Sequence, residues 1–141
     1  MRINKTDYYM GIARAVSMRS TCARRQYGAV IVKNDEIIAT GYNGSPRGAF
    51  NCSDNNICYR MVNNVPHGEQ YEKCEAVHAE QNAMISASRD QMIDSVMYLA
   101  GYEDGREIVA VPCNICRRMI INAGIAKVIN KKEGLANALD S

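Results

Sequence analysis

Two short motifs hold the residues with the clearest capacity for chemistry: His78-Ala79-Glu80 and, later in the chain, Pro112-Cys113-Asn114-Ile115-Cys116. Two cysteines spaced i and i+3 in the first turn of a helix point the same way, so both thiolates can bind one metal ion. The helix N-terminus lowers their pKa and favours the deprotonated form. The imidazole of His78 would be the third protein ligand, which leaves the fourth position for water. This donor set predicts a catalytic zinc ion, because a structural zinc normally has four protein ligands.

Glu80 stands two residues after His78 and is predicted to move protons rather than to bind the metal. Zinc brings the pKa of water towards neutrality and so supplies hydroxide at ordinary pH. A carboxylate beside it can take the proton of the water, pass it to a ring nitrogen and protonate a leaving amine. His-x-Glu together with Pro-Cys-x-x-Cys is the signature of zinc-dependent nucleobase deaminases, and we therefore predict hydrolytic loss of an amino group.

Other interpretations of these motifs remain open. A Cys-x-x-Cys pair alone is also typical of a redox pair or of half a structural zinc site. Glu80 could be a solvated acid that only complements the helix dipole. The non-enzymatic alternative is a zinc-stabilised binding module, which would lack the proton shuttle or close the metal with a fourth ligand. Glu80 is present, and Cys74, four residues before His78, is the nearest fourth ligand to consider.

The elements that must position the motifs follow from the hydrophobic pattern. Before the first motif, we expect a helix from Thr6 and Asp7 to about Met18 and a hairpin of residues 28–32 and 37–42 around a polar turn at 33–36. Residues 43–74 are rich in Asn, Gly, Pro and Ser and have no sustained period. Loops of such length inside a compact domain are usually functional or pinned.

The second half of the sequence alternates between strand and helix patterns. The expected elements are a helix over about 77–88 that begins at His78, a strand at 96–100, a turn at 101–105, an extended piece at 107–111, a helix with Pro112 in its first turn and Gly124 at its end, a strand at 126–129 and a short helix at 133–139. This order predicts an α/β fold, a three-layer α/β/α sandwich with a mixed central sheet of about five strands.

Length and composition restrict the class of protein. A chain of 141 residues suits one domain, residues 1–141, with the long loop at 43–74. The net charge of +2 gives no basic stripe for a nucleic-acid backbone, so we expect no nucleic-acid partner. We see no signal peptide or membrane span, and expect a cytoplasmic protein without membrane contact. In that reducing compartment, the six cysteines are expected to be metal ligands or free thiols.

Five segments of the sequence resemble the deoxycytidylate (dCMP) deaminases of the cytidine and deoxycytidylate zinc deaminase family. They are residues 22–24, 28–32, 41–46, 78–83 and 112–116. The resemblance implies the cytidine-deaminase fold and hydrolysis of the C–N bond of a cyclic amidine, converting dCMP to dUMP and ammonia and supplying dUMP for thymidylate synthesis. It also implies a homo-oligomer, a hexamer, with dCTP as activator and dTTP as inhibitor.

The same resemblance suggests substrate-binding residues. By it, Asn43 should contact the sugar, and Arg24 or Arg47 should meet the phosphate, a role that suits the guanidinium fork. Asn43 could equally be a turn residue, and either arginine could be a solvated surface charge.

A second group of possible ligands lies in and near the long loop: Cys22, Cys52, Cys58, His67 and Cys74. Some family members carry a structural zinc in the region of Cys22 and Cys52, and such a metal would supply folding energy to the loop. The alternative is that these residues are free or buried thiols and an ordinary histidine.

Other deaminase substrates are the main competitors within the enzyme class. Enzymes for free cytidine usually have Cys where this chain has His78, which argues against a nucleoside substrate. A transfer-RNA deaminase is expected to have a basic C-terminal helix, whereas residues 133–141 contain no Lys or Arg. The choice between dCMP and dCTP stays open, because the two share base and sugar.

Overall fold

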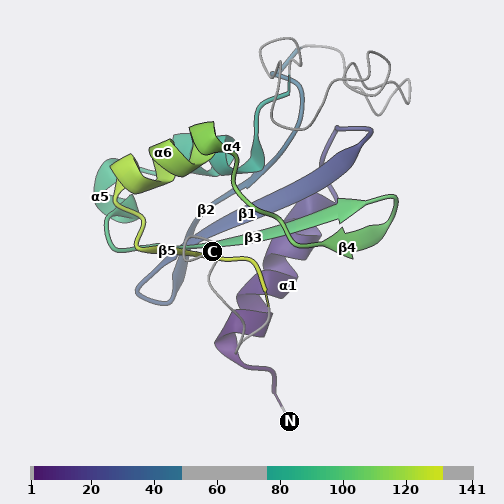
Figure 1. Cartoon of the computed structure of the whole chain (residues 1–141). Coiled ribbons are helices and arrows are strands. Elements are labelled where there is room, and N and C mark those ends of the chain that lie inside the picture. Colours follow the sequence, from purple (N-terminus) through teal and green to yellow (C-terminus); the bar gives the residue numbers. More distant parts are fainter. Residues whose placement is uncertain (1, 49–75, 132–141) are drawn as a thin grey trace.

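The computed structural model describes residues 2–48 and 76–131. In chain order the elements are α1 (Lys5–Ser17), β1 (Arg25–Lys33), β2 (Glu36–Tyr42), α4 (Ala79–Ile85), α5 (Arg89–Met92), β3 (Val96–Glu103), β4 (Arg106–Ile108), α6 (Asn114–Ala123) and β5 (Lys127–Ile129) (Figure 1). None of the helices in these two ranges is long and apolar enough to cross a membrane.

The strands form one mixed sheet with the order β2-β1-β3-β4. β1 runs antiparallel to β2 and, along its other edge, antiparallel to β3. The far edge of β3 has two partners, because β5 pairs parallel with its first half and β4 pairs antiparallel with its last three residues. Five strands of mixed direction are what the sequence predicted.

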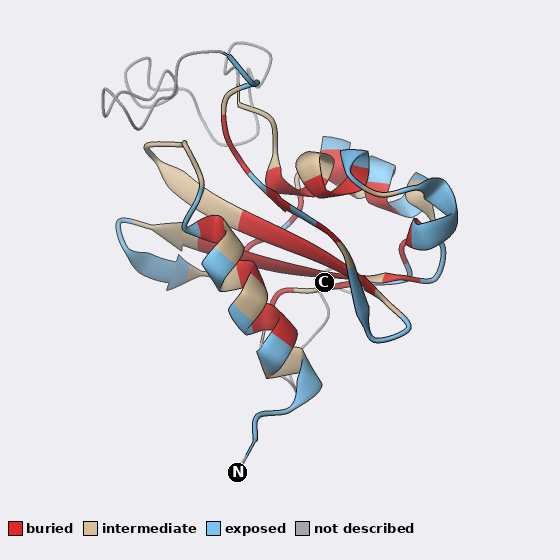
Figure 2. Ribbon diagram, turned by 180° about the vertical axis from the view of Figure 1, so that it is seen from behind, coloured by how far each residue is buried: buried red, intermediate tan, exposed pale blue. Residues whose placement is uncertain are grey.

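Helices cover both faces of this sheet (Figure 1). Val30 and Val32 of β1 pack with Met10 of α1, whereas the alternate residues Ala29 and Ile31 belong to the core under α4 and α6. Side chains of a strand alternate between the faces, so one strand contributes to both cores. Figure 2 shows the buried strands between the helices, with the outer side of α1 exposed. The predicted three-layer α/β/α sandwich is confirmed.

Two glycines allow the helices to lie very close to the sheet. A Cβ at Gly28 would stand 2.1 Å from the carbonyl oxygen of Ala13 in α1. A Cβ at Gly41 would stand 2.3 Å from the backbone nitrogen of Ala83 and 2.5 Å from the carbonyl oxygen of Ala79, both in α4. Only glycine fits such contacts, so Gly41 fixes how closely α4, the helix of the first motif, approaches β2.

Most of the expected elements are present, with α1 beginning after the N-cap Asn4 and the hairpin turning at Asn34 and Asp35, both at positive φ. The predicted turn at 101–105 is wrong at its start. β3 continues to Glu103, and the turn is confined to Asp104 and Gly105, whose positive φ values suit a tight hairpin. Gly101 stays in the strand, where the ring of Tyr27 lies over it.

Two helix boundaries also differ from the prediction. α4 ends at Ile85, since Ser88 caps a separate short helix, α5, by accepting the N–H of Gln91. Pro112 precedes α6 instead of lying in its first turn, because Cys113 is the N-cap residue. The predicted helix at 133–139 and most of the predicted loop at 43–74 lie outside the described residues.

Candidate metal and proton-transfer site

His78 occupies the N-cap position of α4, with extended backbone angles of φ −72° and ψ 153°. The preceding residue, Val77, forms a two-residue bridge with Gly44, the residue that follows Asn43 after β2. The first helical bond runs from the N–H of Asn82 to the carbonyl of His78, at 3.0 Å. The segment after β2 therefore holds the start of the helix from which His78 projects.

Cys113 and Cys116 lie at the start of α6, as their spacing predicted. Cys113 is the N-cap, and its sulfur accepts the backbone N–H of Cys116 at 3.4 Å. Cys116 is fully buried and Cys113 half-buried. Gly124, in the left-handed region at φ 86°, ends the helix. The first turn of α6 thus presents two sulfurs to one side and offers a backbone donor to one of them.

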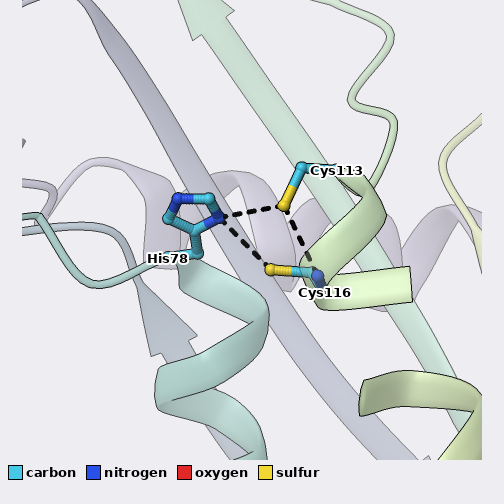
Figure 3. A group of neighbouring side chains, drawn as sticks. All are labelled: His78, Cys113 and Cys116. Carbon is cyan, nitrogen blue, oxygen red and sulfur yellow. Dashed lines mark hydrogen bonds between the residues drawn. The ribbon is translucent and has the colours of Figure 1, made fainter. Parts of the chain in front are cut away.

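The three side chains converge on one point (Figure 3). Nδ1 of His78 lies 3.2 Å from Sγ of Cys116 and 3.5 Å from Sγ of Cys113. All three donor atoms lie within 4.8 Å of one another, as a shared metal ion requires. Tetrahedral zinc, with its usual bond lengths to nitrogen and sulfur, separates these two donors by about 3.6 Å. The donor set and its spacing therefore fit zinc.

The thiols polarise each other in this arrangement. The hydrogen bond from Cys116, together with that of His78 and against the effect of burial, lowers the pKa of Cys113 to about 3. The hydrogen bond to Cys113, followed by burial, raises the pKa of Cys116. One thiolate is thus already favoured at the helix N-terminus, where its charge is stabilised, and a metal ion would displace the remaining proton.

Glu80 lies in the first turn of α4 and is 5% exposed. It is the one buried carboxylate among residues 2–48 and 76–131. Burial raises its pKa, with the charge and hydrogen-bonding effects of His78 and Cys116 acting in the opposite direction. A buried acid with a raised pKa, hydrogen-bonded to the sulfur of Cys116, can accept and return protons beside the metal position.

Asn43 is buried and tied into the backbone around it. Its Oδ1 accepts from the hydroxyl of Ser20 at 2.6 Å and from the N–H of Tyr27 at 2.8 Å. Its Nδ2 donates to the carbonyl of Arg25 at 2.9 Å. These bonds leave at most one N–H of the carboxamide for a substrate. Asn43 therefore joins the segment after β2 to the start of β1 and to Ser20, which precedes it.

The two arginines proposed for the phosphate lie in different surroundings. Arg47 is exposed and lines a cavity of about 670 Å³ between the end of β2 and α4, with Val77 and Asn82 on its wall. Arg24 is half-buried just before β1. His78, Glu80 and the two cysteines are not among the residues that line this cavity.

Of the second predicted group of ligands, only Cys22 lies within the described ranges, as a half-buried free thiol. Cys52, Cys58, His67 and Cys74 lie outside those ranges. Among the residues that the structure describes, the group able to hold a metal ion is the one formed by the two motifs.

Sequence reasoning missed Gln81, which contacts the site from α4. Its Oε1 accepts the N–H of His78 at 2.9 Å, and its Nε2 donates to Sδ of Met119 at 3.9 Å. A signal was present, since Gln three residues after an N-cap is half of a capping box. The bridge between Gly44 and Val77 had no local signal, because it joins segments far apart in the sequence.

A histidine and two cysteines around one point, with a buried carboxylate beside them in an α/β/α sandwich, define a zinc-dependent hydrolytic centre. Comparison with known proteins agrees with this class. The model of the family described as cytidine and deoxycytidylate deaminase zinc-binding region matches residues 3–132. The chain therefore belongs to the cytidine and deoxycytidylate deaminase family.

Individual relatives show how far the likeness extends. The deoxycytidylate deaminase of Mycobacterium phage D29 is 39% identical over 132 residues, which cover 90% of this chain and 94% of the relative. That of Schizosaccharomyces pombe is 35% identical over 87% of this chain, but the chain spans only 35% of its length. Among solved structures, a dCMP deaminase of cyanophage S-TIM5 has a TM-score of 0.63 at 30% identity, covering 91% of this chain and 82% of that one. Another structure of the cyanophage enzyme, in complex with dCMP and dUMP, has a TM-score of 0.60 at 28% identity.

Proposed function

We propose that this protein hydrolyses the amino group of dCMP to give dUMP and ammonia. The observation that carries the proposal is the convergence of His78, Cys113 and Cys116 beside the buried carboxylate of Glu80. The relatives named deoxycytidylate deaminase, and the solved relative with dCMP and dUMP, support this substrate over other cytosine compounds.

His78, Cys113 and Cys116 would hold the zinc ion, and their three donor atoms are already gathered around one point. A zinc ion with three protein ligands supplies a Lewis acid that lowers the pKa of water and makes it nucleophilic at neutral pH. The position of Cys113 at the N-cap of α6 favours metal binding, because the N-terminal end of the helix stabilises the thiolate form of Cys113.

Glu80 is the proton carrier of the proposed reaction. Its carboxylate takes a proton from the water that adds to C4 of the cytosine ring and delivers it to N3. It then transfers the second proton of that water to the amino group, so that the C4–N bond breaks, ammonia leaves and the C4 carbonyl of uracil forms. The burial that raises the pKa of Glu80 makes its carboxylate a better proton acceptor, since a carboxylate of ordinary pKa takes up protons less readily near neutral pH.

For the rest of the nucleotide, we propose that Arg47 or Arg24 binds the phosphate and that Asn43 meets the sugar. The place of Arg47 on a cavity next to Val77, the neighbour of His78, supports Arg47. The remaining N–H of the Asn43 carboxamide is a donor suited to a sugar hydroxyl.

The proposed assembly is a homo-oligomer, a hexamer by family resemblance, regulated by dCTP and dTTP. Exposed apolar side chains on α4 and α6 support self-association, since Ile85 is 75% and Ile121 64% exposed.

A second zinc bound by Cys22 with residues of 52–74 is also proposed, and two zinc ions per fully loaded chain would support it. The cytoplasm is the proposed compartment, because thiols that bind catalytic metal stay reduced there.

The direct test incubates the zinc-loaded full-length protein with dCMP, dCTP, deoxycytidine and cytidine in parallel and follows loss of the amino group. We expect the highest kcat/KM with dCMP. A higher kcat/KM with dCTP would show that dCMP is not the preferred substrate and would require a new assignment of the phosphate-binding residues. If zinc-loaded protein deaminated none of the four compounds, the proposed function would be refuted.

A further inference from the structure

Four hydrogen bonds hold the backbone that carries His78. The N–H of Val77 donates to the carbonyl of Gly44 at 2.7 Å, and the N–H of Gly44 donates to the carbonyl of Val77 at 3.1 Å. The carbonyl of His78 accepts from Asn82 at 3.0 Å. Its N–H donates to Oε1 of Gln81 at 2.9 Å. Because the first three bonds join backbone groups, substituting Gln81 removes the fourth bond and leaves those three in place.

The same side chain also reaches the other helix of the site. Nε2 of Gln81 donates to the sulfur of Met119, a long contact at 3.9 Å. Met119 follows Cys116 by three residues, so the two lie on neighbouring positions of α6. One half-buried amide therefore contacts both the backbone of one metal ligand and the helix that carries the other two.

We infer that Gln81 is a positioning residue for the metal centre, which sets the imidazole of His78 by fixing its backbone N–H. The inference rests on the proposed zinc site. The N–H of an N-cap residue has no backbone partner within its helix, so losing Gln81 removes one restraint on the backbone at His78, while the bridge to Gly44 and the bond to Asn82 remain. Nδ1 would then face the two sulfurs for only part of the time, and zinc would bind more weakly.

The expected magnitude follows from other metal sites. Removing a group that orients a ligand typically weakens metal affinity or activity by about 10-fold to 100-fold. Gln81 acts on the backbone of His78 and not on its ring, and the bridge to Gly44 persists, so we expect the lower end, about tenfold.

The experiment measures zinc dissociation constants of the full-length protein by competition with a chromophoric chelator, at a temperature where circular dichroism shows every variant folded. Gln81→Ala should bind zinc about tenfold more weakly than wild type, and Gln81→Glu, which keeps the acceptor, should stay within about threefold. Cobalt substitution adds a spectroscopic signature, because d–d bands respond to ligand geometry. They should change in Gln81→Ala and be restored in Gln81→Glu.

Gln91 provides a matched control. It occupies the same position in α5, where its Oε1 accepts the N–H of the N-cap Ser88 at 3.1 Å, and no residue of α5 belongs to the metal-binding group. Gln91→Ala removes an equivalent cap and should change zinc affinity by less than about twofold, even if it lowers thermal stability.

Three results would overturn the inference while wild type binds zinc: Gln81→Ala within about threefold of wild type, Gln81→Glu as weak as Gln81→Ala, or Met119→Leu as weak as Gln81→Ala. The last would assign the effect to the α6 contact. Failure of the wild-type protein to bind zinc would instead reject the proposed function itself, and the role of Gln81 with it.

Discussion

Replacing Glu80 by Gln removes the proposed proton carrier while keeping its shape. Gln can hydrogen-bond but cannot take a proton from water or return one to the ring and the amine. General acid–base catalysis typically contributes about 100-fold to 10,000-fold. Glu80 is the one buried carboxylate in the described ranges and serves more than one transfer, so we expect a loss of about 10,000-fold in kcat, close to 5.5 kcal/mol of transition-state stabilisation.

The structure also predicts what the substitution leaves unchanged. Glu80 does not supply any of the three donor atoms that could hold the metal, so the zinc content of Glu80→Gln should match that of wild type. Burial disfavours the ionised carboxylate, and a neutral amide removes that cost, so the melting temperature should be equal or higher. KM should change much less than kcat, because the lost interaction belongs to the transition state.

The assay follows dCMP absorbance in single-turnover and steady-state experiments on protein whose zinc content has been measured. Glu36→Gln, an exposed acid at the start of β2, is the control and should retain activity within about twofold. If zinc-loaded Glu80→Gln deaminated dCMP within about tenfold of wild type, Glu80 could not be the proton carrier.

Substitutions at four further residues test other parts of the structure. Cys113→Ala should lose zinc and activity, whereas Cys113→Ser should retain the helix cap but still lose zinc. Metal analysis measures the zinc content, and the melting temperature reports the helix cap. Wild-type zinc content in either variant would reject Cys113 as a ligand. Arg47→Ala should lower kcat/KM for dCMP about tenfold or more, with little change in kcat/KM for deoxycytidine. Arg24→Ala is measured in the same way, for comparison with Arg47→Ala. Equal losses on both substrates would indicate that the arginine acts by packing and does not bind the phosphate. Tyr9 donates a hydrogen bond to Asp35, and this bond raises the pKa of Tyr9 from 10.0 to about 12. The folded state therefore holds the hydroxyl proton more tightly than the unfolded state does. The contribution of this hydrogen bond to stability is complete below pH 10 and is lost as pH rises to about 12. In urea unfolding, Tyr9→Phe should therefore cost about 1 kcal/mol at neutral pH and show no such loss between pH 10 and 12; an unchanged alkaline slope would contradict this.

The group of residues able to hold a metal ion was predictable because much of its geometry is local. Cys113 and Cys116 share a face through helical spacing alone, and Pro112 before them and Gly124 after them mark the limits of that helix. His78 was identified by its motif partner Glu80 and by the helical pattern that follows it. What placed His78 next to the cysteines was the fold class, which the alternation of strands and helices indicated.

Local signals did not reveal contacts between distant segments and did not decide between competing helix caps. Gly101 is of a residue type common in turns, yet it stays in β3 because it pairs with β1 along one edge of the strand and with β4 along the other. Ser88 interrupts a helical pattern by capping the next helix, a choice between two local options that the pattern alone did not resolve. The buried carboxamide of Asn43 bonds to Ser20, Tyr27 and Arg25, none of which its own neighbourhood indicates.

Two of the three residues that could hold a metal ion are also N-cap residues, and this links the stability of the helices to the proposed chemistry. His78 occupies the N-cap position of α4 and Cys113 that of α6, both with extended backbone, so the position of each side chain depends on where its helix begins. The backbone N–H groups at the start of α6 favour a thiolate there, which is the form that binds zinc. Since Gly41 lets α4 lie directly on β2, backbone contacts fix the position of the α4 N-cap relative to the sheet. Nδ1 of His78 lies 3.2 Å and 3.5 Å from the two sulfurs, close to the spacing that a tetrahedral zinc ion requires.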